Sequence, residues 1–183
     1  ILMLGIILII IVLVIIALIA MYNGLVSSRA KVDNAWSQID VQLQRRFDLI
    51  PNFVETVKGY AAHESETFEK ITKLRTSWSN ASSVAEKAEL DNQLSGALKT
   101  IMAVSENYPD LKSSQNFIQL SDELAGTENR IATARRDYNE AVKEYNLKIK
   151  KFPIGIIANM FGYEAKEYFQ ASEESQEVPN VQF

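Results

Sequence analysis

The side chains with the most obvious capacity for chemistry are a histidine and a glutamate that stand together. His63, the one histidine of the chain, is followed by Glu64. A zinc hydrolase motif of this kind needs a second histidine one helical turn later on the same face, and Thr67 stands there instead. The chain also has no cysteine. We therefore expect no metal site and no cofactor, and interpret His63 as a surface residue beside a helix-face glutamate.

Two charged residues, Arg46 and Glu64, are unusual because each falls in a row of otherwise apolar residues. A charge in such a row costs several kcal/mol unless it is paired or reaches the edge of the helix face. On one helix the two residues would lie about 27 Å apart, so they cannot pair with each other. Glu64 could instead form an ion pair with an arginine of the last long helix. Either a contact that fixes helix register, or an edge position, or a functional dyad would explain these charges. The candidate partners of Glu64 are Arg130, Arg135 and Arg136.

The remaining charged residues form mixed faces, which on long helices usually mean solvation and pairing between neighbouring turns. We find no glycine-rich phosphate loop, no nucleophile elbow and no paired catalytic carboxylates, so no catalytic residue is assigned and no enzyme is expected. Nineteen basic against twenty-three acidic residues give a net charge of −4. This balance argues against a nucleic-acid partner, which normally meets a basic patch. Asn139 and Asn146, one heptad apart, are expected to cross-link helices.

The elements that must position these residues begin with an uncharged stretch, residues 1–21. As a helix it would span roughly 30 Å, the thickness of a bilayer's hydrocarbon core, so it predicts a transmembrane helix with the lipid bilayer as partner. The run is longer than a secretory signal's apolar region, and Leu18 makes Ala17 to Ala20 a poor cleavage site. We therefore expect an uncleaved anchor. Arg29 and Lys31 follow it, which by the positive-inside rule favours a cytoplasmic C-terminal domain.

Apolar residues then recur every seven positions, in two rows that predict coiled-coil-like helices. These rows predict one long helix over residues 22–79, kinked near Pro51, with a break near Gly59 as the alternative. Ser83 and Glu86 match a capping box that opens a second helix, residues 83–108. The rows are Arg29, Trp36, Leu43, Ile50, Val57, Glu64, Ile71 and Trp78, and Val32, Ile39, Arg46, Phe53, Tyr60, Thr67 and Leu74.

The last long helix, residues 114–152, has the most regular apolar spacing in the chain. A short apolar helix, residues 153–162, and an acidic, mobile tail, residues 163–183, follow it. The fold class expected is all-α: an N-terminal transmembrane helix that continues into an antiparallel up-and-down helical bundle with long coiled-coil-like helices. The row of the last helix comprises Phe117, Leu124, Ile131, Tyr138, Tyr145 and Phe152.

Several segments resemble the LemA family of bacterial membrane proteins, and together they cover almost the whole chain. The resemblance implies an N-terminal membrane helix followed by an all-helical bundle, with the N-terminus outside and the bundle in the cytoplasm. It implies a single-pass protein of the bacterial inner membrane, and it brings no enzymatic activity, cofactor or catalytic set. The segments are Val32 to Leu43, Arg45 to Asn52, Glu55 to Ala61, Gln93 to Leu98, Tyr108 to Lys112, Gly126 to Ile131, Arg135 to Asn139 and Val178 to Phe183.

These observations favour a membrane-anchored helical scaffold that self-assembles. The alternative is a transmembrane signalling or regulatory adapter that acts on other membrane proteins. Self-assembly is expected because the first helix is predicted to be longer than the helices that could cover it, and large exposed apolar patches usually mark an interface. The residues expected at this homo-oligomer interface are Trp36, Ile39, Leu43, Ile50, Val181 and Phe183.

Overall fold

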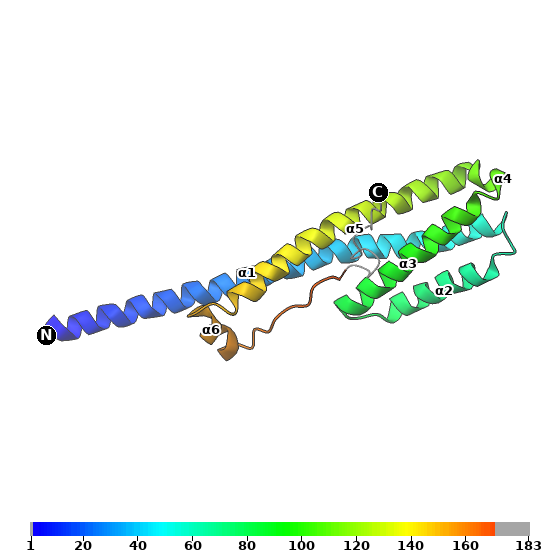
Figure 1. The fold of residues 1–183 in the computed structure, drawn as a ribbon. Coiled ribbons are helices and arrows are strands. Elements are labelled where there is room, and N and C mark those ends of the chain that lie inside the picture. Colours follow the sequence, from blue (N-terminus) through cyan, green and yellow to red (C-terminus); the bar gives the residue numbers. More distant parts are fainter. Residues whose placement is uncertain (1, 171–183) are drawn as a thin grey trace, which may run out of the picture. The chain divides into compact units, whose positions relative to one another are not determined.

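The computed structural model describes residues 2–170 as helices joined by short turns, without a strand in that range (Figure 1). Residue 1 and residues 171–183 lie outside this description. The all-α class and the long apolar N-terminal helix are thereby confirmed. The helices are α1 (Leu2–Lys58), α2 (Ser65–Asn80), α3 (Val84–Ser105), α4 (Pro109–Lys112), α5 (Gln115–Lys148) and α6 (Ile154–Met160).

The chain divides into two compact units, and the long helices α1 and α5 contribute residues to both. The first unit comprises residues 1–37 and 136–167, and the second comprises residues 38–135 and 168–183.

In the first unit, α1 changes character along its length. Every position from 3 to 20 is exposed, whereas Leu25, Ser28 and Val32, spaced three and four apart, are buried on one face. The end of α5 covers this face in the antiparallel direction. The Trp36 and Tyr138 rings lie 5.6 Å apart, and Lys148 Nζ donates to the Gly24 carbonyl at 2.7 Å.

The segment after α6 is held against α5, which corrects the expectation of a mobile tail that starts at residue 163. We call residues 163–167 the strap. Tyr145 and Tyr138 donate their hydroxyl hydrogens to the carbonyls of Glu164 and Glu167, at 2.9 and 2.8 Å. Asn146 both donates to the Lys166 carbonyl and accepts from its amide. The strap is ordered because these half-buried polar groups replace water as partners of its backbone.

In the second unit, residues 38–58 of α1 pack with α2, α3 and the first part of α5. The Phe47 and Trp78 rings stack with centroids 4.4 Å apart, so the end of α2 returns alongside the middle of α1. The Phe53 and Phe117 rings lie 5.7 Å apart. The predicted capping box is present at the start of α3: Ser83 Oγ accepts from the Glu86 amide at 3.1 Å, and the Glu86 carboxylate accepts from the Ser83 amide.

The expected single helix over residues 22–79 is wrong, and the structure has the alternative, a break near Gly59, because α1 ends at Lys58 and α2 begins at Ser65. Pro51 lies inside α1 and does not end it. The turn is closed by backbone hydrogen bonds from Tyr60 and Ala61 to the Val57 carbonyl. Ala61 is fully buried in the turn, so the chain reverses around a small apolar side chain that fits there.

The last long helix is also shorter than expected, since α5 ends at Lys148 and not at residue 152. Its apolar row is buried from Phe117 to Tyr145, but Phe152, the expected final member, is 85% exposed. Proline disfavours a helical conformation in the residue before it and lacks an amide hydrogen, which explains why the helix stops ahead of Pro153.

Candidate functional site

The most unusual side chain in the second unit is a buried arginine. Arg46, on α1, is 1% exposed, and its Nη1 donates to Asp91 Oδ1 of α3 at 2.6 Å. Glu128 Oε2 of α5 lies 3.6 Å from its Nη2. The charge in the apolar row, the Arg46 guanidinium, therefore lies where three helices meet. A buried charge is tolerated only if it is paired, and Arg46 is paired there. Arg46 Nε has no hydrogen-bond partner among the described residues.

Burial dominates the electrostatics of this contact. Loss of water raises the pKa of the Asp91 carboxyl, and the attraction of Arg46 reverses only part of that rise. The desolvation of the carboxyl thus outweighs the gain from its partner, which is common for buried ion pairs. Such a pair adds little net stability, but it strongly favours the one alignment of α1, α3 and α5 in which both charges meet. This geometry agrees with the register-fixing interpretation of Arg46.

A cleft of about 200 Å³ adjoins the pair, lined also by Asn92, Lys99 and Arg135. Three cations face two carboxylates there, and neither a nucleophile of the cysteine type nor a histidine is among the lining residues. The lining also includes Ser95, and together these polar groups can bind water or a small ion. The cleft is consistent with a structural polar contact at the helix interface.

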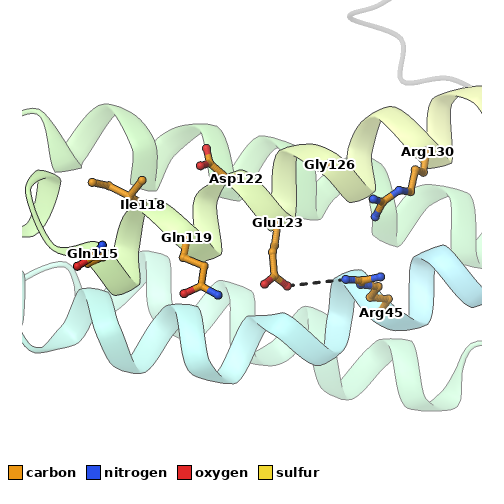
Figure 2. A pocket seen from close by; sticks show the side chains of 8 residues that line it. All are labelled: Arg45, Gln115, Ile118, Gln119, Asp122, Glu123, Gly126 and Arg130. Atoms are coloured by element: carbon orange, nitrogen blue, oxygen red, sulfur yellow. Dashed lines mark ion pairs between the residues drawn. The ribbon is translucent and has the colours of Figure 1, made fainter.

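A second groove of about 460 Å³ lies between α1 and α5, also within the second unit (Figure 2). Figure 2 shows Arg45 and Glu123 directed toward each other across it, with Nη2 and Oε2 4.0 Å apart. Arg130 and Asp122 complete a balanced set of charges. Because the Arg45 and Glu123 side chains are 54% and 37% exposed, their attraction is largely screened by water. The groove is an open, charge-neutral surface.

The other residues singled out from the sequence are scattered. His63 is exposed in the turn between α1 and α2, and Glu64, the next residue, makes no side-chain hydrogen bond to the start of α2. Arg130 and Arg135 line the two grooves just described, while Arg136 pairs with its neighbour Asp137. The proposed pairing of these arginines with Glu64 is therefore wrong. Within residues 2–170, no three His, Cys, Asp or Glu side chains gather in a way that could hold a metal ion.

The residues expected at an oligomer interface mostly belong to the chain's own core. Ile39 and Leu43 are fully buried, and Ile50 is 2% exposed, so their apolar face already has intramolecular partners. Trp36 is half-buried against Tyr138. The premise of an uncovered face is wrong because α5 runs antiparallel to α1 from Trp36 to Phe53, and the end of α2 lies beside Phe47. Val181 and Phe183 lie outside the described residues.

At the sequence level, the contact residue Asp91 was missed and Asn146 was assigned the wrong partner. Asp91 was not singled out, although it falls on the buried face of α3 together with Ala88, Leu94 and Leu98. An acidic residue in an apolar row is the same signal that marked Arg46. Asn146 binds the strap, not a neighbouring helix, and the sequence offered no sign of this because the strap has no regular period.

One described helix, α1, is long and apolar enough to cross a membrane, and none of its most hydrophobic stretch is buried. The model of the LemA family matches residues 35–183. Magnetosome protein MamQ 2 of Paramagnetospirillum magneticum is 31% identical over 179 residues, covering 84% of this chain and 66% of that protein. Protein LemA of Metamycoplasma hominis is 31% identical over 152 residues, covering 82% and 69%.

Magnetosome protein MamQ of Magnetospirillum gryphiswaldense is 28% identical over 178 residues, covering 83% of this chain and 65% of the relative. The chain spans about two thirds of the length of these relatives. The family match begins at residue 35 and includes parts of both units, Arg46 and Asp91 among them. The chain is therefore a membrane-associated protein and belongs to the LemA family.

Proposed function

We propose that this protein is a single-pass, membrane-anchored helical scaffold without catalytic activity, which self-assembles at the bacterial inner membrane. The observation that carries the proposal is the continuity of α1. The same helix exposes only apolar side chains from residue 3 to residue 20 and then buries one face from Leu25 to Val57. A helix of this kind connects a bilayer to a folded protein without an intervening loop.

The arrangement of the charged side chains in the described residues favours a scaffold over an enzyme. The buried charges are paired, and the two polar grooves of the second unit carry opposing charges. The folded part is proposed to lie in the cytoplasm, because Arg29 and Lys31 follow the apolar segment closely and are exposed.

Self-assembly is proposed because a membrane anchor raises the local concentration of the chains. Chains held parallel in one bilayer meet at a high effective concentration, so that even a weak contact becomes populated. The contact surface proposed here is the apolar part of α1, since the face from Trp36 to Ile50 is covered within the chain. Neighbouring transmembrane helices associate by close packing, which needs no additional folded domain.

The test is the size of the particle in mild detergent, measured by size-exclusion chromatography with light scattering. We expect several chains per particle. Because the chain has no cysteine, single cysteines placed at successive positions from Ile6 to Leu18 provide a second measurement in vesicles. Disulfide-linked dimers should form along one helix face, every three to four residues.

A monomer at micromolar concentration, with no preferred face for disulfide formation, would contradict self-assembly. That result would favour the alternative, an adapter that acts on a different membrane protein. Crosslinking in native membranes followed by mass spectrometry would then identify its partner.

A further inference from the structure

The short helix α6 lies against α1 immediately beyond the exposed apolar segment. Leu25 of α1 packs in one cluster with Ile157 and Ala158 of α6. The rings of Tyr22 and Phe161 lie 4.9 Å apart. Figure 1 shows α6 beside this part of α1. Because Tyr22 follows the apolar segment by two residues, α6 lies at the level where α1 would leave the hydrocarbon core.

The residues in and around α6 also include strongly exposed apolar side chains. We call Phe152, Ile156, Met160 and Phe161 the α6 patch. Their exposed fractions are 85%, 55%, 76% and 58%, although side chains of these types are normally buried. Ile156 and Met160 are one helical turn apart on α6, and Phe152 lies in the turn just before this helix. Apolar side chains exposed to this degree are poorly suited to water.

Positive charge and a groove adjoin the α6 patch. Lys150 and Lys151 are exposed just before Phe152. An open groove of about 600 Å³ is lined by Ile149, Phe152, Ile156 and Tyr163, together with Lys150 and Glu164. Apolar side chains beside lysines are the pattern by which peripheral helices bind the boundary between lipid headgroups and acyl chains. Tyrosines such as Tyr22 and Tyr163 are also enriched at that boundary.

We propose that the α6 patch is a second membrane contact, which inserts into the interface of the same bilayer that α1 crosses. The occupant is lipid, because the patch lies beside the end of the exposed apolar segment of α1, where the Phe161 ring contacts Tyr22. Lys150 and Lys151 would meet anionic headgroups. The inference rests on the proposed membrane-spanning role of α1 but not on self-assembly. It gives the protein a contact that senses the lipid surface in addition to its anchor.

The experiment places one cysteine at a time in the full-length chain, which has no native cysteine to interfere. Each cysteine receives a nitroxide spin label, and the protein is reconstituted into phosphatidylglycerol–phosphatidylethanolamine vesicles. Collision rates with oxygen, which enters lipid, and with a nickel chelate, which stays in water, then report depth. The test variants are Phe152→Cys and Met160→Cys. Val14→Cys in the apolar segment and Asn34→Cys further along α1 are the lipid and water controls.

We expect the labels at positions 152 and 160 to lie about 5–10 Å below the lipid phosphates, between the two controls. Adding Ile156→Asp should move the label at position 160 into water, while the label at position 14 stays in lipid. Far-UV circular dichroism checks that each variant remains folded.

Labels at positions 152 and 160 that match the water control would overturn the inference. Labels shielded from both reagents would overturn it in favour of a second copy of the chain as the occupant. If the label at position 14 were itself accessible to the nickel chelate, the proposed anchor would fail. That failure is recognised separately, from the control alone.

Discussion

Arg46, Asp91 and Glu128 together illustrate how one polar cluster can define the alignment of three helices. An apolar interface between helices tolerates small shifts, because leucine and isoleucine side chains pack in several arrangements. The 2.6 Å contact between Arg46 and Asp91 opposes such shifts, since a shift would leave a buried charge without its partner. Such a contact specifies one helix alignment, but burying its two charged groups costs desolvation free energy.

Replacing Asp91 with alanine should therefore destabilise the fold by about 3–5 kcal/mol, because the Arg46 guanidinium would stay buried without its nearest partner. The double variant Arg46→Met, Asp91→Leu should recover most of that loss, since apolar replacements of buried pairs are often neutral. Denaturant titration of the detergent-solubilised chain measures both. Lys112→Ala, which removes the exposed pair with Glu106, is the control and should cost less than about 1 kcal/mol. A double variant as unstable as Asp91→Ala would show that the charges themselves are required.

Tyr138 provides a pH-dependent signature for the strap. Burial raises the pKa of its hydroxyl to about 12, and the nearby carboxylates of Glu167 and Asp33 add to the rise. In the unfolded chain a tyrosine titrates near pH 10. Because the folded-state pKa is the higher one, stability from the protonated hydroxyl is complete below pH 10 and is lost as pH rises through about 12.

The measurement is tyrosinate absorbance during alkaline titration of the native chain and of Tyr138→Phe. The difference between the two curves should have its midpoint near pH 12. The same difference measured in denaturant should move to about pH 10. A native midpoint equal to the denatured one would mean that Tyr138 is not held against the strap.

At the scale of elements, α1 contains an internal proline that its helix tolerates. Pro51 cannot donate a hydrogen bond to the carbonyl one turn earlier. Pro51→Ala should therefore stabilise the protein, by about 1–3 kcal/mol, because it restores that bond and relieves the contact of the ring. Thermal or denaturant unfolding followed by circular dichroism measures the change. A clear loss of stability would indicate that the proline ring has a packing role that outweighs the missing bond.

The buried face of α5 gives a second prediction at this scale. Ile131 is 3% exposed, and Ile131→Ala should cost about 2–5 kcal/mol through lost burial and the cavity left behind. Lys143 on the same helix is exposed, and Lys143→Ala should change stability by less than about 0.5 kcal/mol. Similar losses for the two variants in denaturant titration would mean that the assignment of the buried face is wrong.

The helices that bury α1 could be predicted from apolar spacing, but the choice between one kinked helix and a break near Gly59 could not. Lys58, the last residue of α1, and Ser65, the first of α2, are seven positions apart, which is one heptad. A reversal of this length leaves the seven-residue rows in phase, so a hairpin and a continuous helix give the same pattern. This wrong prediction also affected the predicted oligomer interface. A helix over residues 22–79 would be longer than its neighbours, so Ile39 and Leu43 were expected to be uncovered.

For the candidate site, the sequence indicated that Arg46 needs a partner but not which one. Helical spacing determines which face is apolar, and it contains no information on which helices meet there. The strap was equally hidden, since its contacts join single polar side chains to backbone groups. The α6 patch was partly visible as a short apolar segment. Its exposure depends on where α5 ends and which face of α6 meets α1.

At the scale of the whole molecule, the proposed topology has a direct test in intact cells. Lys143→Cys on the folded side should react with a membrane-impermeant maleimide only after the cytoplasmic membrane is disrupted. Met3→Cys, at the other end of the apolar segment, is the matched control and should react in spheroplasts before disruption. Labelling of Lys143→Cys in intact spheroplasts would contradict a cytoplasmic bundle.

The contact between Lys148 and the Gly24 carbonyl has a consequence for biosynthesis, because its partners are 124 residues apart in the chain. At bacterial synthesis rates of about 5–20 residues per second, α1 emerges roughly 6–25 seconds before the part of α5 that covers it. During that interval the apolar segment can already enter the membrane, while Leu25 and Val32 are not yet covered by α5. A chain released early would therefore be a tethered fragment with an uncovered apolar stripe, and we expect its removal to fall to proteases that act at the membrane surface.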